Sequence, residues 1–396
     1  GYAAKKGEQA KEFQKLIKAV HSQGMNVVMD FYFKDVSPEF MLTCMRYYAL
    51  RFHIDGFRFN QEGVSVEWLR QDPVLSHLKL FGYHWDECGY EAGQEMFCEM
   101  NDRFLVTARR FLKSDEGQVE DFYYQFREQK KGVAMVHSIT GHNGFTLRDL
   151  VSYDVKHNEA NGEKNLDGTE YNYSWNCGAE GPSRKKEVRE KRSSQERNAF
   201  LMLMLGMASP RILSGVEFGN TQKGNNNAYC QDNAITWLDW SLLEKNKELF
   251  SYVKKLIEFR RNHPLYQSRR YLTGMDSEGL GAPDVSCHGV EPWNARFSYY
   301  SRELGVLFFG GYYGGNSLYF AFNFHWEPHV FYLPEIEKNK EWKQVFDTSN
   351  TMEMAVDGKK YELAPRSIAV FENVPVKKTA GTSDKKKIPA KGHKNA

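Results

Sequence analysis

The strongest constraint on the fold of this chain is an alternation of apolar strands and amphipathic helices that continues to about residue 265. Residues 8–24 carry apolar side chains at helical spacing, and Gly24 ends this pattern. Residues 26–33 follow as a nearly continuous apolar run, which is typical of a strand buried on both faces of a parallel sheet. The alternation predicts βα units around a parallel sheet, in the simplest case a barrel.

The elements that follow continue the same alternation. Ser37 and Pro38 form a typical helix start, and they predict a helix over residues 39–52. Further helices are predicted at 65–71, 100–114, 193–209 and 247–263, and further strands at 54–59, 78–85, 132–139 and 210–215. Barrel enzymes keep their chemistry at the carboxyl ends of the strands, so the polar and aromatic residues that follow these strands are the functional candidates.

After about residue 265 the pattern changes to short alternating strands separated by Gly, Asn and Pro. The predicted strand segments are 288–293, 297–313, 317–334 and 366–372. They predict a separate antiparallel β domain. We therefore expect a partial barrel at 1–265, a C-terminal β-sandwich at 266–376 and a disordered Lys-rich tail at 377–396.

Charge and cysteine content exclude several functional classes. The net charge is +2, but the tail at 377–396 holds seven Lys and one Asp, which leaves about −4 on the rest. A mildly acidic body is not typical of a nucleic-acid binder, and no apolar run reaches membrane-spanning length. The six Cys form no C-x-x-C pair, so we expect no metal, no cofactor and reduced thiols in a cytoplasm.

Two long segments carry a specific family resemblance. Residues 138–182, which begin "SITGHNGFTLRDL", and residues 212–240, which begin "ILSGVEFGNTQKGNNN", resemble the isoamylase-type glycogen debranching enzymes of glycoside hydrolase family 13, in the alpha-amylase superfamily. The segment "YFAFNFHWEPHVFYLP" resembles that family's C-terminal β-sandwich. The resemblance implies a (β/α)8 barrel of the TIM type, with a groove for α-glucan (glycogen, amylopectin or maltooligosaccharide) at its C-terminal face.

The chemistry that this resemblance implies needs three carboxylates: a nucleophile, an acid/base and a transition-state stabiliser. Retaining glycosidases hold two carboxyl groups roughly 5 Å apart. Here the matching positions hold Asn60 for the nucleophile, Tyr83 for the acid/base and Asn143 for the stabiliser. An amide carries no charge, and a tyrosine with a pKa of roughly 10 is a poor proton donor and acceptor near neutrality. We therefore expect all three catalytic functions to be lost.

Other positions of the family's site are retained in this chain. The resemblance implies that Asp30, Arg58, Trp85 and His142 contact substrate. Tyr32, Tyr83 and Trp85 could stack on glucose rings, with ordinary core packing as the equal alternative.

Arg58 raises a question of charge balance, because in the family it lies among the catalytic carboxylates. With those positions neutral, a buried Arg58 would be uncompensated, at a cost on the order of 3–5 kcal/mol. We predict a substitute partner for it among Asp30, Glu62 and Asp86.

Two polar loops are further binding candidates. The amide-rich segment 224–233, "GNNNAYCQDN", offers groups that suit sugar hydroxyls, and a turn-rich loop is the alternative. Segment 157–168, "HNEANGEKNLDG", matches no metal-binding spacing and is expected to be a solvated loop.

Parts of the family pattern are missing from the chain. Between Asp30 and Asp55 there is room for one crossover helix, where the family usually inserts an extra domain. The chain also begins at what resembles the second barrel helix. We expect either a fragment of a longer polypeptide or a rearranged barrel with an open edge, that is, an N-terminally truncated and degenerate family member.

Three hypotheses follow. The favoured one is a catalytically inactive, isoamylase-like protein that binds α-glucan or pairs with an active debranching subunit. The second is an active α-1,6-glucosidase with substitute carboxylates, for which Glu62, Asp86 and Glu87 are the candidates. The third is a non-functional fragment.

Overall fold

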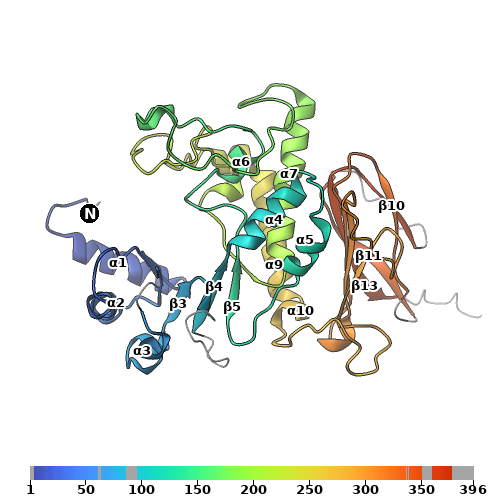
Figure 1. Cartoon of the computed structure of the whole chain (residues 1–396), viewed down its shortest axis with the longest axis horizontal. Helices are drawn as coiled ribbons and strands as arrows, with labels where there is room; N and C mark the ends of the chain where they lie inside the picture. The colour runs from blue at the N-terminus through green and yellow to red at the C-terminus, as the bar shows by residue number, and fades with distance from the viewer. Residues whose placement is uncertain are drawn as a thin grey trace, which may run out of the picture.

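The computed structural model describes residues 4–60, 64–85, 96–335, 337, 339–349 and 359–376. Its first part is built on a six-stranded parallel sheet in which the strands follow chain order, from β1 to β6 (Figure 1). The strands are β1 (Val28–Phe31), β2 (Gly56–Phe59), β3 (Lys79–Gly82), β4 (Phe97–Asn101), β5 (Ala134–His137) and β6 (Ser209–Pro210). The parallel sheet in chain order confirms the predicted α/β fold, and within the described residues β1 and β6 are its two edges.

Helices accompany this sheet, and most of them follow a strand in the chain. The α-helices are α1 (Gln9–Ser22), α2 (Pro38–Phe52), α3 (Val66–Gln71), α4 (Asp102–Leu112), α5 (Val119–Phe126), α6 (Leu147–Leu150), α7 (Lys186–Leu205), α8 (Leu242–Lys245), α9 (Lys247–Asn262) and α10 (Pro264–Gln267). Short 3₁₀ turns are η1 (Leu75–His77), η3 (Glu159–Asn161), η4 (Val216–Phe218) and η5 (Gly310–Tyr312). Among the described residues, no helix combines the length and apolarity needed to cross a bilayer.

Helices α2 and α4 begin at residues whose side chains cap the first turn. The Ser37 hydroxyl accepts a hydrogen bond from Phe40 N at 3.2 Å, and Pro38 occupies the first turn of α2. The Asn101 side chain likewise accepts from Phe104 N at 3.0 Å and begins α4 directly after strand β4. Such caps satisfy backbone N–H groups that the helix itself leaves unpaired.

The C-terminal part is a β-sandwich of two antiparallel sheets. The larger sheet has the order β11-β13-β9-β8-β7, and the smaller one pairs β10 with β12. The strands are β7 (Val285–His288), β8 (Glu303–Phe308), β9 (Leu318–Asn323), β10 (His329–Tyr332), β11 (Lys340–Asp347), β12 (Lys360–Leu363) and β13 (Ser367–Pro375). Phe331, Tyr361 and Phe371 are buried between the two sheets, which confirms the predicted sandwich.

The other face of the larger sheet packs on helices of the first part. Phe111 lies 4.6 Å from Phe324, and Phe122 lies 5.3 Å from Phe322, measured between ring centroids. Helices α4, α5, α7 and α9 contribute to one hydrophobic core together with β8, β9 and β13. The five-stranded antiparallel sheet is therefore fixed to the parallel-sheet part by a shared aromatic core. Figure 1 shows these helices between the parallel sheet and the C-terminal strands.

The first four strands and helices α1–α3 have a second core. Met45, Phe57, Leu80 and Phe97 are fully buried there. In Figure 1 helices α1–α3 form one end of the molecule, away from the C-terminal sheets.

Some predicted elements were wrong in position or missing. The strand predicted at 288–293 is β7, which ends at His288, and the strand predicted at 210–215 is the two-residue β6. Helix α5 and strands β4, β11 and β12 were not predicted. Strand β11, "KEWKQVFD", is mostly polar and only partly buried, so it lacks the apolar alternation of a sheet interior.

Candidate functional site

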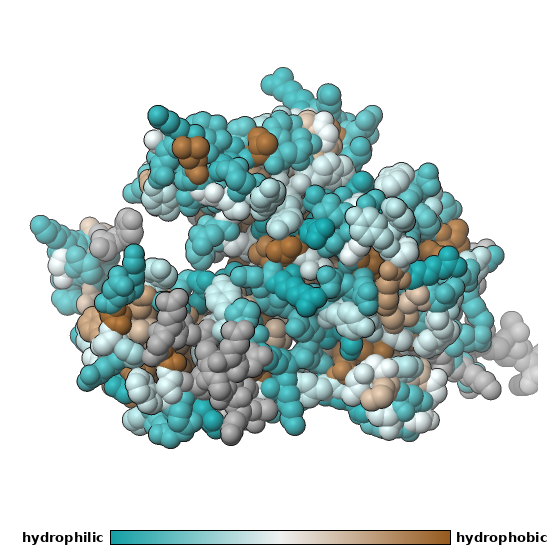
Figure 2. Space-filling model, in the orientation of Figure 1, coloured by the Kyte–Doolittle hydropathy of each residue, from teal (hydrophilic) through white to brown (hydrophobic). Residues whose placement is uncertain are grey.

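The predicted site residues lie at or near the carboxyl ends of the parallel strands. Asp30 is in β1 and Arg58 is opposite it in β2, while Asn60 and Tyr83 directly follow β2 and β3. Figure 2 shows the surface hollowed between the α1–α3 end of the molecule and the lobe that holds α6 and the neighbouring loops. The hollow lies on the side of the sheet where the chemistry of barrel enzymes is found.

Arg58 has two polar partners. Its Nη1 lies 2.5 Å from Asp30 Oδ2, and its Nη2 donates to the Tyr83 hydroxyl at 3.0 Å. Burial lowers the pKa of Arg58, but the bonds to Tyr83 and Asp30 outweigh that effect, so the pKa is raised. The predicted substitute partner is confirmed as Asp30, while Glu62 and Asp86 lie outside the described residues.

Asn60 makes a two-point contact with the chain after β1. Its Oδ1 accepts from Phe33 N at 2.8 Å, and its Nδ2 donates to Phe33 O at 2.7 Å. The side chain thus pairs with a backbone donor and a backbone acceptor at once, which an ionised carboxylate, having no donor, cannot do. A carboxylate at this position would set an oxygen against the carbonyl of Phe33, so the local structure is built for asparagine.

His142 and Asn143 lie on the loop after β5, and both side chains are exposed. The loop is anchored by Gly144, whose N–H donates to Asn226 O at 2.9 Å, and by Thr146, which caps α6. Their exposure leaves both side chains accessible from solvent.

Arg211 adds a second cation, which sequence reasoning missed. It directly follows β6, and its Nη2 donates to Ser138 Oγ at 3.3 Å. Burial lowers the pKa of Arg211, and the positive charge of Arg58 lowers it further, whereas Asp102 and Asp30 act in the opposite direction. No sequence signal pointed to Arg211, because it lies inside the strand predicted at 210–215, whereas the observed β6 ends one residue before it. This edge of the sheet therefore combines two guanidinium groups with carboxylates.

Trp85 and Tyr32, two of the aromatic candidates, have different environments. Trp85 is 1% exposed, its indole N–H donates to Cys98 O at 2.9 Å, and its ring centroid lies 4.5 Å from that of Phe97. The expectation that Trp85 contacts sugar is wrong for this conformation, because its ring is part of the core. Tyr32 directly follows β1 and is 80% exposed, so its ring is available to a ligand.

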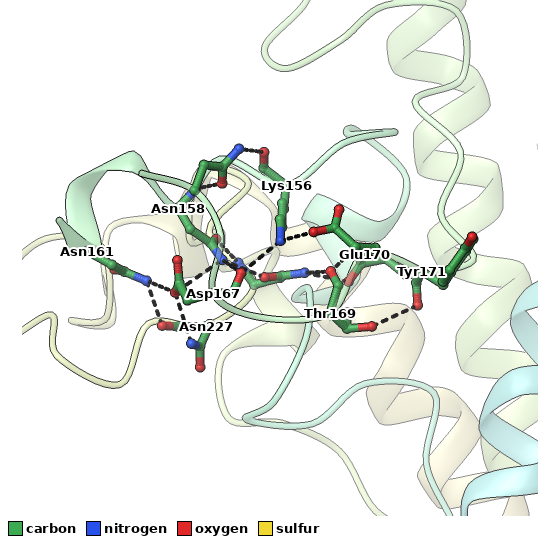
Figure 3. A network of polar contacts seen from close by, with 11 residues as sticks. Lys156, Asn158, Asn161, Asp167, Thr169, Glu170, Tyr171 and Asn227 are labelled. Carbon is green, nitrogen blue, oxygen red and sulfur yellow. Dashed lines mark hydrogen bonds and ion pairs between the residues drawn. The ribbon is translucent and has the colours of Figure 1, made fainter. Parts of the chain in front are cut away.

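The amide-rich segment 224–233 is held against segment 157–168 and the residues after it by a network of side-chain contacts (Figure 3). Asn226 donates to Thr169 O at 2.8 Å and to Asn172 Oδ1 at 3.0 Å. Asp167 accepts from Asn161 at 2.7 Å and from Asn227 at 2.9 Å.

These contacts lower the pKa of the Asp167 carboxyl, through the bond from Asn161 first and then that from Asn227. Asn225 and Asn226 are 1% and 2% exposed. The expectation that these amides bind sugar hydroxyls is wrong for Asn225 and Asn226, whose side chains hold the two loops together instead.

Comparisons with known proteins find relatives that carry glycogen-debranching and glycogen-operon names. A glycogen debranching enzyme from Klebsiella pneumoniae subsp. pneumoniae is 40% identical over 257 residues, which are 59% of this chain and 39% of the relative. A glycogen operon protein GlgX homolog from Haemophilus influenzae is 34% identical over 350 residues, 80% of this chain and 50% of the relative. The chain therefore spans half or less of the length of these relatives. No family model matches it.

Solved structures agree on the fold. A pullulanase mutant from Paenibacillus barengoltzii, solved in complex with maltotriose, superposes with a TM-score of 0.65 at 16% identity, covering 93% of this chain and 62% of that one. In sequence the chain is therefore similar to glycogen debranching enzymes and GlgX homologs, and in fold it is similar to a pullulanase, in agreement with the resemblance found in its motifs.

Proposed function

We propose that this protein binds α-glucan at the carboxyl edge of its parallel sheet without hydrolysing it. The observation that carries the proposal is the pairing of the Asn60 amide with both backbone groups of Phe33. The family resemblance assigns the nucleophile to this position, and here the side chain is neutral and held by local structure.

The environment of Tyr83, at the position that the resemblance assigns to the acid/base, also supports binding without hydrolysis. The Tyr83 hydroxyl accepts a hydrogen bond from Arg58, so one of its lone pairs faces a cation. Asp30 is the other partner of Arg58, and its carboxylate is ion-paired with that guanidinium group. Hydrolysis with retention needs one carboxylate to attack and a second carboxyl group to shuttle a proton, and these residues supply neither.

Binding requires less than catalysis does. Tyr32 offers an exposed ring at the end of β1, and His142 and Asn143 offer exposed polar groups after β5. Aromatic faces and hydrogen-bonding side chains of this kind recognise sugar rings and hydroxyls. The superposed pullulanase is a point mutant in complex with maltotriose, and we extend its ligand class, maltooligosaccharide, to this chain.

The setting that we propose is glycogen metabolism in the cytoplasm, with an active debranching subunit as the protein partner. Two observations support it: the relatives carry glycogen-debranching and glycogen-operon names, and the described cysteines Cys44, Cys98, Cys177, Cys230 and Cys287 are free thiols.

Isothermal titration of the protein with maltohexaose tests the binding part of the proposal. We expect saturable binding, and we expect Tyr32→Ala to weaken it about fivefold, since one stacking contact contributes roughly 1 kcal/mol. Tyr47→Ala is the matched control, because Tyr47 is also exposed but lies in α2. Equal affinity of all three proteins, or no binding by any of them, would refute a glucan site at this edge.

A further inference from the structure

Glu303, His325 and His329 form a cluster of metal-ligating side chains in the C-terminal sandwich. Each offers one ligand atom, and these atoms all lie within 4.8 Å of one another. All three side chains are partly buried. The sequence predicted no metal site, because that prediction considered only the cysteines and segment 157–168, and it is the fold that brings Glu303 to the two histidines.

The positions of these residues connect the two sheets. Glu303 opens β8 and is paired with Asn323 of β9, while His329 opens β10 in the smaller sheet. His325 lies on the connection between β9 and β10. A group bound by all three residues would therefore join the five-stranded sheet to the two-stranded sheet at one end of the sandwich.

A buried asparagine holds this connection in place. Asn323 is 0% exposed, and its Nδ2 donates to Glu327 O at 2.9 Å and to Leu363 O at 3.2 Å. Its Oδ1 accepts from His325 N at 3.1 Å. The backbone between the two histidines is thus fixed against β12, which preorganises the cluster.

His329 is oriented as a ligand. Its Nδ1 lies 3.2 Å from Glu327 O and donates to it, which directs Nε2 toward Glu303 Oε1 at 3.4 Å. Metal-binding histidines commonly donate their second ring nitrogen to a carbonyl in this way. The other oxygen of Glu303 accepts from Arg302 N at 3.2 Å, so Oε1 remains directed at the histidine.

His325 is the third candidate ligand, and its coordination to a metal would replace one hydrogen bond. Its Nδ1 accepts from Glu327 N at 3.1 Å, and its ring stacks on Trp326 at a centroid distance of 4.1 Å. Coordination through Nδ1 would replace the bond from Glu327 N. Because Glu327 is exposed, water can then satisfy the released N–H.

We propose that Glu303, His325 and His329 bind a divalent transition metal, with Zn²⁺ as the best match. Two imidazoles and one carboxylate suit Zn²⁺, and water would take the fourth position in a site that is open to solvent. The site lies in the sandwich, outside the proposed glucan edge, and the metal would stabilise the contact between the two sheets. Its predicted effect is on stability rather than on glucan affinity.

The test uses the full chain after treatment with a chelator and removal of the chelator. Titration with ZnCl₂, followed by calorimetry and by thermal unfolding, is expected to show one equivalent bound at this site and a melting temperature raised by several degrees. Glu303→Gln, which keeps the side-chain shape, is expected to weaken that binding at least tenfold and to remove most of the thermal shift. His77→Gln, an exposed histidine near β3, is the matched control and should bind zinc as the parent does.

His329→Ala is the second variant, and its melting temperature without zinc shows whether the sandwich is intact. Loss of the zinc-dependent shift in both variants supports the site. No zinc binding by the parent chain, or binding that neither Glu303→Gln nor His329→Ala weakens, would overturn the proposal.

Discussion

At the residue scale, Asn60 shows what a motif predicts and what it leaves open. The sequence alone indicated that a charge expected from the family was missing. It could not indicate that the amide would pair with Phe33, because that contact joins residues 27 positions apart across two strands. For Arg58 the sequence narrowed the choice of partner to three carboxylates, one of which was Asp30. The β1–β2 register then places Asp30 opposite Arg58.

Asn60→Asp is expected to destabilise the fold rather than to restore catalysis. The substitution removes the donor to Phe33 O and places a charged oxygen beside that carbonyl, so we expect a loss of about 1–3 kcal/mol in the free energy of unfolding. Chemical denaturation measures this loss. Asn143→Asp, on an exposed loop, is the control and should stay within about 0.5 kcal/mol of the parent. An Asn60→Asp protein as stable as the parent would contradict the role assigned to the amide.

His288 predicts how stability depends on pH. Burial lowers the pKa of His288 to about 4, and its Nδ1 accepts from Trp293 N at 2.7 Å. The unfolded chain protonates this residue near pH 6.5, so between pH 6.5 and pH 4 it binds more protons than the folded chain does. Stability that is present at pH 7 should therefore fall as the pH drops through this window, by on the order of 3 kcal/mol.

Denaturation at pH 7 and at pH 4.5, in the parent and in His288→Gln, checks this expectation. The variant is expected to lose less stability on acidification than the parent, even though its free energy of unfolding at pH 7 is expected to be lower. The pKa values of His137 and His263 are also lowered, chiefly by burial, so some acid sensitivity remains in the variant. Identical losses in both proteins would show that His288 is not the responsible group.

At the element scale, local sequence signals predicted where most helices and strands lie. The predictions failed where the burial of a segment differed from what its polarity indicated. The cap at Ser37 and the apolar spacing of α9 were both visible in the sequence. Strand β11 was not, because its residues are mostly polar and it pairs at the edge of its sheet. The amide-rich loop misled in the opposite sense: polar residues predicted a binding surface, whereas tertiary contacts buried Asn225 and Asn226.

Two serines at helix starts allow a matched test of capping. Ser37 Oγ accepts from Phe40 N, whereas Ser65, before α3, makes no side-chain bond to its helix. Ser37→Ala is expected to cost about 1 kcal/mol in the free energy of unfolding, and Ser65→Ala a few tenths of that. Thermal unfolding of both variants measures the difference. Equal losses would mean that the Ser37 contact does not stabilise α2.

At the scale of the whole molecule, the parallel-sheet part and the sandwich share one aromatic core. The sequence predicted both parts and the point at which the pattern changes. It could not predict their contact, because the apolar stripe of a helix looks the same whatever sheet it covers. Strands β1–β4 and helices α1–α3 have a core of their own, so the structure predicts two cooperative unfolding units rather than one.

Phe322→Ala tests the shared core. Phe322 is 0% exposed and lies 5.3 Å from Phe122 of α5, between ring centroids. Truncation is expected to cost about 3–5 kcal/mol in the free energy of unfolding and to speed hydrogen exchange in α5 as well as in β9. Phe40→Ala, at an exposed position in α2, serves as the control. Faster exchange in the C-terminal strands without any change in α5 would contradict the coupling.

The most direct test of the central claim measures binding and cleavage on one sample. The purified protein is incubated with glycogen, the fraction that sediments with the polymer is determined, and new reducing ends are counted against a blank without protein. We predict co-sedimentation with no reducing ends above the blank. Reducing ends that accumulate with the parent protein and disappear with Tyr83→Phe would contradict the account.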